Sequence, residues 1–598
     1  MQDATAPRYG PESLLQAAEP FLAMIRRCPS AKAARHRLYE EVSREQYYQH
    51  DDTMAAGTTA LRNVRDAARA LRSMLNPAAE QQAGFSMAGT LWDLASGRID
   101  PSLSPAFFAE TTHLFLALTG KARLRSLVPG SPTAGLEGRE AARERSDRLD
   151  ILWQHVQDRM ARYSSGLSPE SLDRRARREE AVAGALGGSR EDFEDWRWQV
   201  RHVLADATTL SRAMRLLPEE REAIEPLADY RIPFGVTPYY ASLMDDDPEA
   251  GRDRALRAQV LPPKDYVDEM IARRGQRHCA FDFMLERNTS PTDLVTRRYP
   301  AIAILKPFNT CPQICVYCQR NWEIDQPMAP GALASPQVLD EAIGWIREHP
   351  SIREVLVTGG DPLGLPDGPL MEILGKVAAI PHVDLIRIGT RTPVTLPMRI
   401  TEALAAGLGS LREPGRREVC VVTHVQHPYE VTPRTVRAVD RLRRQGIPVF
   451  NQMVFTLFVS RRFEASALRM LLRRIGIEPY YTFLPKGKEE LADYRVPIAR
   501  LMQEQAEEAR LLPGSRRTDE AVYNVPSLGK NYLRAMQHRD LLAILPDGSR
   551  VYSFHPWEMG IAPSEPYIGR DVPLLEYLER LRGIGEDPQD YESLWYYY

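Results

Sequence analysis

The stretch "AIAILKPFNTCPQICVYCQR", residues 301–320, decides the fold of this protein. It opens with an apolar, β-rich run and ends in three cysteines, Cys311, Cys315 and Cys318, separated by three and then two residues. A short apolar run of this kind is typical of a buried strand. Clustered thiols in a long chain with only six cysteines favour metal binding or redox chemistry over a disulfide framework. The stretch therefore predicts a strand with a metal or redox site at its carboxyl end.

Five further strand-like runs follow, with amphipathic helical segments between them: 353–360, 383–391, 418–425, 447–455 and 478–485. Six strand-helix units in succession predict a parallel sheet with right-handed crossovers. Because eight units would close a full barrel, six predict a partial (β/α)6 TIM-like barrel of the α/β class, with its chemistry at the carboxyl ends of the strands. Residues 1–185 show only helical periodicity and predict an added all-helical domain.

Polar or unusual residues stand at the ends of the predicted strands, as that fold requires. The second strand is followed by Gly359, Gly360 and Asp361, the third by Thr390 and Arg391, and the fourth by His424 and His427. The fifth contains Asn451 and Gln452, and the sixth runs into Lys486. The carboxyl ends of parallel strands meet at one edge of a sheet, so these residues predict a single site there.

Length and composition limit the other possibilities. The 598 residues carry a net charge of −3, which gives no basic excess to suggest a nucleic-acid partner. We found neither a signal-peptide pattern nor an apolar stretch long enough to span a membrane, and we expect a cytoplasmic protein. The predicted organisation is a helical domain of unknown role (1–185), a helical segment leading into the barrel (186–297), the barrel (298–490) and a C-terminal region (491–598) that covers the active site.

Three thiolates from one loop can hold three irons of a 4Fe-4S cluster and leave the fourth iron open for chemistry. The alternatives are a zinc site that lacks one ligand, or buried structural thiols. The pattern C-x-x-x-C-x-x-C, with Tyr317 before the third cysteine, resembles the radical S-adenosylmethionine (SAM) superfamily. "TGGDPL" (358–363) is similar to the glycine-rich second-strand motif of that superfamily, whose backbone receives SAM.

Within the superfamily, the chain is similar to the lysine 2,3-aminomutase family, pyridoxal phosphate (PLP)-dependent radical enzymes that move an amino group from Cα to Cβ. The resemblance rests on blocks such as "DWRWQVRH", "TPYYASLMDDDP", "RIGTRTPVTLPMRIT", "THVQHPYEVT" and "PYYTFLPKG". It runs from about Asp195 to the "LGK" at 528–530 and beyond, and leaves the first 185 residues outside.

The resemblance implies three cofactors and their ligands. The three cysteines would hold a 4Fe-4S cluster, and SAM would lie against Gly359, Gly360, Asp361, Arg391 and His424. PLP would be bound covalently by Lys530, with Arg298 and Gln452 nearby. Two positions depart from the family. Ser527 and Leu528 replace part of its glycine run before the PLP lysine, and Ile302 replaces the second arginine of its "RYP" segment.

The substrate is predicted from charge. Arg320 matches the family arginine that grips the substrate α-carboxylate. Lys486 stands where lysine-specific members have an aspartate, and Asn524 or Tyr523 stands at a second such position. A lysine in the pocket would repel a substrate ammonium, so the resemblance implies an acidic amino acid, with L-glutamate the best single choice. Alternatively, Lys486 points to solvent or pairs with an acid such as Asp493.

The predicted partners are the amino acid substrate and an electron donor such as flavodoxin or ferredoxin, with neither nucleic acid nor membrane involved. The family also implies a homo-oligomer. Two other functions stay open at this stage: a different radical SAM reaction, on lysine or on another substrate, and a cluster-bearing interaction protein whose working part is the helical region.

Overall fold

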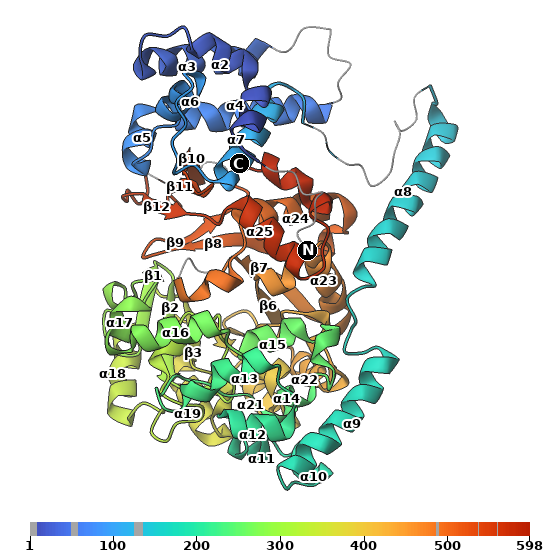
Figure 1. Ribbon diagram of the computed structural model, residues 1–598. Coiled ribbons are helices and arrows are strands. Elements are labelled where there is room, and N and C mark those ends of the chain that lie inside the picture. Colours follow the sequence, from blue (N-terminus) through green and yellow to red (C-terminus); the bar gives the residue numbers. More distant parts are fainter. Residues whose placement is uncertain are drawn as a thin grey trace. The chain divides into compact units, whose positions relative to one another are not determined.

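The computed structural model describes residues 9–48, 58–122, 124, 135–485, 489–535, 538–558 and 560–598. The chain forms two compact units. The barrel unit consists of Val156–Arg495 and Leu511–Gly529, and the terminal unit consists of Met1–His155, Val496–Arg510 and Lys530–Tyr598. The chain therefore leaves the barrel unit after Arg495, returns at Leu511 and leaves again after Gly529 (Figure 1).

The barrel unit is built on a sheet whose strands lie in sequence order. Strands β2 to β8 are parallel neighbours, and β1 pairs with β2 in the antiparallel sense. The bounds are β1 (Val295–Tyr299), β2 (Ile302–Phe308), β3 (Glu354–Gly359), β4 (Leu385–Gly389), β5 (Glu418–Thr423), β6 (Val449–Val454), β7 (Ile477–Phe483) and β8 (Glu520–Val525). The six predicted strands correspond to β2 through β7. The predicted partial barrel is confirmed, and β1, β8 and β9 (Gly529–Tyr532) are additions to the six predicted strands.

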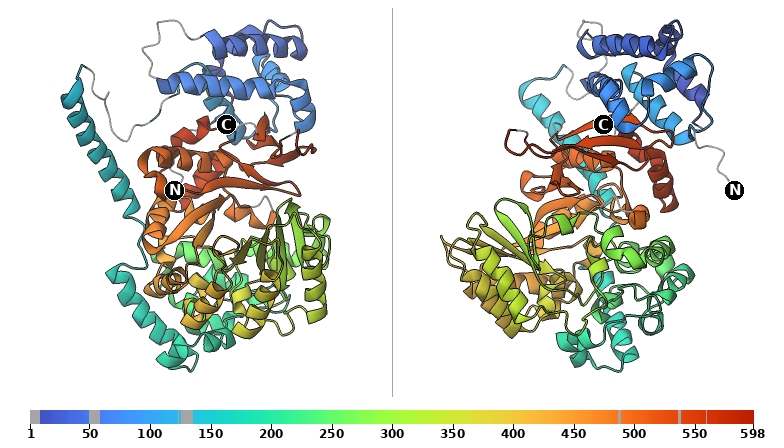
Figure 2. Two further views of the ribbon diagram at one scale, coloured as in Figure 1. Left: turned by 180° about the vertical axis from the view of Figure 1, so that it is seen from behind. Right: turned by 90° about the vertical axis from the view of Figure 1, so that its left-hand side faces the viewer.

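Helices connect the parallel strands along one side of the sheet (Figure 2): α18 (Pro336–Arg347), α19 (Asp367–Ala378), α21 (Glu402–Ser410), α22 (Pro433–Arg444) and α23 (Glu464–Ile475). Helix α22 shows why such segments fold locally. The Thr432 side chain caps its first turn by accepting the N–H of Thr435 at 3.1 Å, and Pro433 occupies the first helical position. The chain then turns at Gly446 with φ of 74°, a conformation that glycine adopts without strain.

Several helices precede the sheet in the barrel unit. Among them are α9 (Pro169–Ala185), α14 (Pro238–Ser242), α15 (Arg254–Val260) and α16 (Lys264–Ala272). Two main-chain hydrogen bonds tie this segment to the cysteine loop. The N–H of Ile314 donates to the Gly235 carbonyl, and the N–H of Val316 donates to the Gln259 carbonyl, both at 2.9 Å. The loop that bears the cysteines is therefore held by the backbone of the preceding segment at two points.

The terminal unit joins helices and strands from opposite ends of the sequence. Its helices include α1 (Pro11–Ala17), α2 (Glu19–Ile25), α3 (Ala31–Tyr48), α4 (Thr58–Met74), α5 (Pro77–Ala83), α6 (Met87–Ala95), α7 (Pro105–Leu118), most of α24 (Ile498–Leu511), and α25 (Leu574–Gly583). Helices α4, α5 and α7 pack against an antiparallel sheet of β10 (Arg539–Ile544), β11 (Arg550–Phe554) and β12 (Tyr567–Arg570). Ala79, Leu542 and Val551 form an apolar cluster there. A buried ion pair at 2.9 Å joins Glu110 of α7 to Arg550 of β11.

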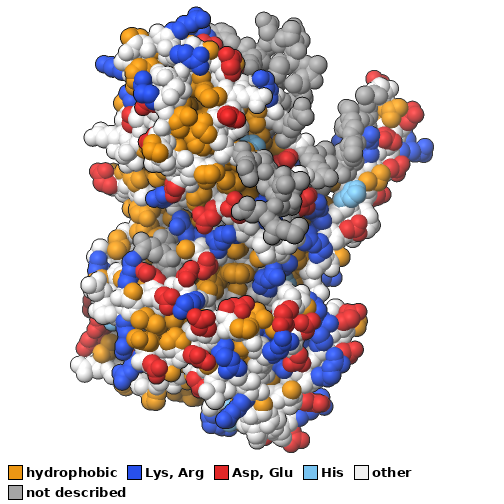
Figure 3. Space-filling model, viewed as in Figure 1, with side chains coloured by type: hydrophobic (Ala, Val, Ile, Leu, Met, Phe, Trp, Pro, Cys, Tyr) orange, Lys and Arg blue, Asp and Glu red, His pale blue; other side chains and the backbone are white. Residues whose placement is uncertain are grey.

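The helical character predicted for the N-terminal region is confirmed, whereas the predicted domain boundaries stay predictions. Among the described residues, none of the helices is long and apolar enough to cross a membrane. On the face shown in Figure 3, Lys and Arg side chains are interspersed with Asp and Glu, in keeping with the small net charge.

Candidate active site

The three cysteines of the loop after β2 lie close enough to influence one another. Burial raises the pKa of the Cys311 thiol well above its usual range, and Asp361, Cys318 and Cys315 raise it further. The other two sulfurs receive hydrogen bonds: Arg391 Nη1 donates to Cys315 Sγ at 2.9 Å, and the backbone N–H of Arg320 donates to Cys318 Sγ at 3.4 Å. Repulsion among three closely spaced, half-buried thiolates would be relieved by a cationic group bound between them.

This donor set fits an iron-sulfur cluster. Within the described ranges, no three His, Cys, Asp or Glu side chains are arranged to hold a single metal ion. A cluster does not require such convergence, because each cysteine binds a different iron. Soft sulfur ligands supplemented by nearby hydrogen-bond donors are the environment that such clusters use. The arrangement therefore favours the cluster over the zinc alternative.

The glycine-rich turn after β3 packs directly against the backbone that leads into the cysteine loop. A Cβ atom on Gly360 would lie 2.0 Å from the Thr310 carbonyl oxygen, and Gly359 has φ of 110°. The Gly360 N–H donates to the Phe308 carbonyl at 2.8 Å, and the Asp361 N–H donates to that of Thr310 at 2.9 Å. Both glycines are thus required by close backbone packing, which sets the position of the cysteine loop.

The Asp361 carboxylate joins this turn to the one after β4. It accepts the hydroxyl of Thr390 at 2.6 Å, that of Thr392 at 3.1 Å and the backbone N–H of Arg391 at 2.9 Å. Burial raises the pKa of Asp361, although these hydrogen bonds act in the opposite direction. With its oxygens occupied in this way, Asp361 acts by positioning Arg391.

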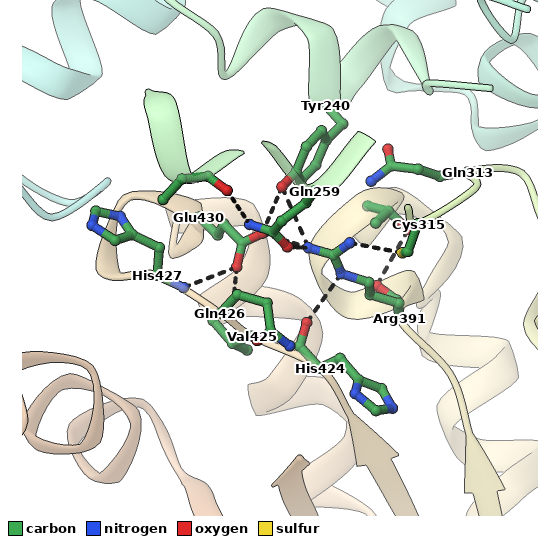
Figure 4. Close-up of polar contacts among 12 residues, drawn as sticks. Tyr240, Gln259, Gln313, Cys315, Arg391, His424, Val425, Gln426, His427 and Glu430 are labelled. Carbon is green, nitrogen blue, oxygen red and sulfur yellow. Dashed lines mark hydrogen bonds and ion pairs between the residues drawn. The ribbon is translucent and has the colours of Figure 1, made fainter. Parts of the chain in front are cut away.

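Arg391 is the centre of a buried polar network that links the ends of β2, β4 and β5 (Figure 4). Its guanidinium donates to Cys315, to Glu430 Oε1 at 2.6 Å and to Gln259 Oε1, while its Nε donates to the His424 carbonyl at 3.1 Å. Burial opposes its charge, but Cys315 and the other anionic or phenolic neighbours raise the pKa of Arg391 well above its usual range. Arg391 therefore stays cationic beside the cysteine loop.

Two neighbours hold the other side of this network. The Tyr240 hydroxyl donates to Glu430 Oε1 at 2.6 Å, and Glu430 Oε2 accepts the N–H of Gln426 at 2.6 Å and that of His427 at 3.2 Å. Burial and the adjacent Glu430 raise the pKa of Tyr240 well above its usual range. The carboxylate of Glu430 thus has four hydrogen-bond donors around it and balances the Arg391 charge.

His424 contributes its carbonyl to Arg391, and its side chain is half-buried. Burial, together with the Arg391 charge, lowers the pKa of His424 to about 4. The imidazole is consequently neutral at physiological pH, and it is suited to donate or accept one hydrogen bond without adding charge to a site that already contains Arg391.

A second buried cluster brings together Arg298 and Arg320, two residues that the sequence predicts to bind anionic groups of PLP and the substrate. Arg298 of β1, Lys306 of β2 and Arg320 all pair with the Glu286 carboxylate, the first at 3.0 Å and the second at 3.4 Å. Arg320 also pairs with Glu323. Burial alone would raise the pKa of Glu286, but Arg320, Lys306 and Arg298 together hold it at about 2.

The cation cluster has unused donors and an excess of positive charge. Three cations face two carboxylates, and the Nε atoms of Arg298 and Arg320 are buried without a hydrogen-bond partner in the described part of the chain. Both side chains are only 8% exposed. A buried, unsatisfied guanidinium is costly, so this geometry fits a carboxylate or phosphate group that would complete the cluster.

The other predicted site residues are more dispersed. Gln452 lies on β6 and its carbonyl accepts a hydrogen bond from Gln426 Nε2 at 3.4 Å. Asn524 and Tyr523 lie on β8, where successive side chains point to opposite faces, so only one of the two can face a given ligand. Lys530 lies on β9 (Gly529–Tyr532), the strand at which the chain leaves the barrel unit. Lys486 lies outside the described residues.

Sequence reasoning missed four residues of these networks: Tyr240, Gln259, Glu286 and Glu430. Tyr240 and Glu430 belong to the blocks "TPYYASLMDDDP" and "THVQHPYEVT", so a signal for both was present without an assigned role. Gln259 and Glu286 lie in stretches with no distinctive spacing, and only the fold brings them to the site.

Comparison with known proteins identifies the class. The model of the radical SAM superfamily matches residues 305–466, which contain the cysteine loop and β3 to β6. An uncharacterized KamA family protein of Methanocaldococcus jannaschii is 45% identical over 539 residues, covering 87% of this chain and 86% of that protein.

Relatives with named activities match a shorter part of the chain. The glutamate 2,3-aminomutase of Clostridioides difficile is 34% identical over 311 residues, covering 52% of this chain and 69% of that enzyme. The L-lysine 2,3-aminomutase of Bacillus subtilis is 32% identical over 314 residues, covering 52% of this chain and 62% of that enzyme. Among solved structures, Streptococcus suis SuiB aligns with a TM-score of 0.28 and 12% identity over 46% of this chain and 60% of SuiB, too distant to bear on function.

The cysteine loop, its position after the first parallel strand and the family match together define a radical SAM enzyme. The chain belongs to the KamA family, and its relatives with named activities are isomerases of the aminomutase type. The resemblance inferred from the sequence is thereby confirmed.

Proposed function

We propose that this chain is a PLP-dependent 2,3-aminomutase that moves the amino group of L-glutamate, or of another acidic amino acid, from Cα to Cβ. The observation that carries the proposal is the position of Arg320. Its backbone N–H donates to Cys318 Sγ, and its guanidinium belongs to the buried cluster of cations around Glu286. A carboxylate bound to Arg320 would therefore lie next to the cluster-bearing loop.

The cofactors would supply the radical chemistry and the carbonyl to which the substrate amine attaches, and the protein would supply binding and orientation. Cys311, Cys315 and Cys318 would hold the cluster, and Lys530 would hold PLP. Electrons would come from a donor of the flavodoxin or ferredoxin type. The unused Nε atoms of Arg298 and Arg320 support binding of one anionic group from the substrate or from PLP at this place.

The protein's own residues have separable tasks in this proposal. Arg391, fixed by Glu430 and Asp361, would hold one positive charge beside Cys315. The neutral His424 imidazole would line the same region without adding charge. Because these hydrogen bonds are already formed, the charged side chains need not reorient during turnover.

The preference for an acidic substrate rests on Lys486, where lysine-specific members of the family carry an aspartate. A lysine ammonium in the pocket repels a substrate ammonium and attracts a distal carboxylate. The identities to glutamate and lysine 2,3-aminomutases, 34% and 32%, are too close to separate the two substrates.

Anaerobic assays test the proposal. The full chain, reconstituted with iron and sulfide, receives PLP, SAM, a reductant and either L-glutamate or L-lysine, and the α- and β-amino acids are separated by chromatography. We expect β-glutamate without β-lysine. β-Lysine alone would refute the charge argument and keep the class, and SAM cleavage without either product would refute the proposed substrates.

A matched pair of variants then isolates the charge at position 486. Lys486→Gln should raise the KM for L-glutamate about tenfold, because the loss of one charge-assisted contact weakens binding by about that factor. Lys488→Gln makes the same charge change two positions along the chain and should leave the KM within about twofold. Equal effects of the two variants would show that Lys486 does not contact the substrate.

A further inference from the structure

A short segment that precedes the barrel, residues 163–175, packs against the turn that carries Glu430. The segment consists of a loop and the first part of α9, and it belongs to the barrel unit. It lies before Asp195, where the resemblance to aminomutases begins, and before residues 305–466, which the superfamily model matches. The turn is a short 3-10 helix, Pro428–Glu430, between β5 and α22. Only the fold brings the segment and the turn together.

Arg175 of α9 joins the loop to the turn. Its Nη1 donates to the Gly166 carbonyl at 3.2 Å, and its Nη2 donates to the Tyr429 carbonyl. Its guanidinium also lies over the Tyr429 ring, 4.4 Å from the ring centre. Arg175 is only 4% exposed and Tyr429 is fully buried, so these contacts are shielded from solvent. A buried carbonyl of the turn thus receives its donor from a charged side chain.

Gly166 allows the loop to approach the turn this closely. Its N–H donates to the Pro428 carbonyl at 3.1 Å. A Cβ atom at this position would lie 2.7 Å from the Tyr429 carbonyl oxygen, and closer still to the Val431 carbonyl oxygen and to the Arg175 guanidinium. The close approach of the two backbones therefore requires glycine here. This is a second feature, independent of the Arg175 hydrogen bonds, that fits the segment to the turn.

The turn sets the position of the Glu430 carboxylate. The Glu430 N–H donates to the His427 carbonyl at 3.1 Å, which closes the turn. Glu430 Oε1 accepts a hydrogen bond from Arg391 Nη2 at 2.6 Å, and Arg391 Nη1 donates to Cys315 Sγ (Figure 4). Helix α9 also packs against α14, whose Tyr240 donates to the same carboxylate oxygen. A displacement of α9 would therefore reach the cysteine loop by way of this salt bridge.

We propose that Arg175 is a positioning residue of the SAM site, which acts on Arg391 through the turn that carries Glu430. This role gives one part of the N-terminal region, α9 with the loop before it, a task in the barrel. It rests on the radical SAM class of the chain and not on the substrate proposed above. Loss of a residue that holds a binding side chain in place typically weakens binding by about tenfold or more.

SAM binding in the absence of an amino acid tests this role. The full chain, loaded with cluster and PLP under anaerobic conditions, is titrated with SAM, and the affinity is expressed per bound cluster. Arg175→Met keeps much of the side-chain volume but removes the donors, and it should weaken SAM binding about tenfold. Arg175→Lys keeps the charge and one donor to the turn, so its affinity should lie within about threefold of the wild type. An unchanged affinity in Arg175→Met would overturn the proposal.

Arg178→Met is the matched control, because Arg178 lies in the same helix and makes the same kind of contact elsewhere. It is 6% exposed, and it donates to the Met244 carbonyl at 3.1 Å and to the Ala213 carbonyl at 2.5 Å. Its loss should lower the midpoint of urea unfolding about as much as the loss of Arg175, but change the SAM affinity less than about twofold. Equal weakening of SAM binding by the two variants would refute a specific role of Arg175.

Hydrogen exchange of the wild type keeps the test independent of how the variants fold. Binding free energies are reciprocal, so if these contacts strengthen SAM binding, SAM must stabilise the contacts by the same factor. With saturating SAM, peptides that cover 163–168 should exchange about tenfold more slowly. Peptides that cover 207–213, which end at a carbonyl bound by Arg178, should change less than about twofold. Equal protection of both sets, or none at 163–168, would contradict the proposal.

Discussion

Replacement of Glu286 by glutamine should strongly destabilise the barrel unit. The side chain is 6% exposed and pairs with Arg298, Lys306 and Arg320. The variant keeps the volume and leaves three buried cations opposite the one remaining carboxylate, Glu323. Breaking a buried pair by removing one partner is strongly destabilising.

The magnitude follows from the pKa of Glu286, which lies at about 2 against an ordinary value of 4.5. A depression of this size corresponds to about 3 kcal/mol of stability at neutral pH, in the range measured for broken buried pairs. The pKa is lowered in the folded state, so this stability is fully present above pH 4.5 and is lost as the pH falls towards about 2.

Urea unfolding followed by circular dichroism, with hydrogen exchange of peptides that cover 286–323, measures the effect. Glu372→Gln is the matched control, because Glu372 pairs with Lys376 at 3.1 Å on the surface and is 66% exposed. We expect about 3 kcal/mol for Glu286→Gln and under about 1 kcal/mol for the control. The difference between the wild type and Glu286→Gln should shrink as the pH falls from 4.5 and vanish near pH 2. A loss below about 1 kcal/mol at neutral pH, or one that does not change with pH, would refute the reasoning.

Three further predictions address the site. Gly360→Ala places a Cβ 2.0 Å from the Thr310 carbonyl oxygen, so it should cost at least about 2 kcal/mol in urea unfolding and prevent iron incorporation, whereas the open position Gly368 should accept alanine. Arg391→Lys keeps the charge but loses the guanidinium fork that contacts Cys315 and Glu430 together; we expect a SAM affinity about tenfold weaker with the cluster still assembled, and an unchanged affinity would contradict this role. Lys530→Ala should abolish the absorbance of protein-bound PLP without changing the iron content, and a retained band would assign PLP to another lysine.

The parts of the fold that local sequence patterns specify were predictable. Strands β2 to β7 are apolar runs between helical segments, and each appears where the pattern placed it. Strand β1, "VTRRY", is short and half polar, so it lacks the apolar run that marks a buried strand. Strand β8, "EAVYNV", follows β7 only after the chain has passed through the other unit, so it stands outside the regular alternation of strands and helices. The cysteine loop was predictable from spacing alone.

The electrostatic networks were less predictable, because they join residues that are distant in the sequence. Glu286 meets Arg320 across 34 positions, and Gln259 meets Arg391 across 132. No local pattern marks such pairs, since their partners are chosen by the fold. Arg298 and Arg320 were identified by resemblance, but their shared carboxylate became visible only in the structure.

The packing of α4, α5 and α7 on β10 to β12 has a consequence for how this chain can be divided. The N-terminal helices supply Ala79 to an apolar cluster and Glu110 to a buried ion pair, whose other members, Leu542, Val551 and Arg550, come from near the C-terminus. A truncation that began at the barrel would leave Arg550 without its carboxylate and uncover the apolar face of that sheet. The N-terminal helices are thus half of a fold whose other half lies about 440 positions further along the chain, so the two halves can pack together only after the whole barrel segment between them has been translated.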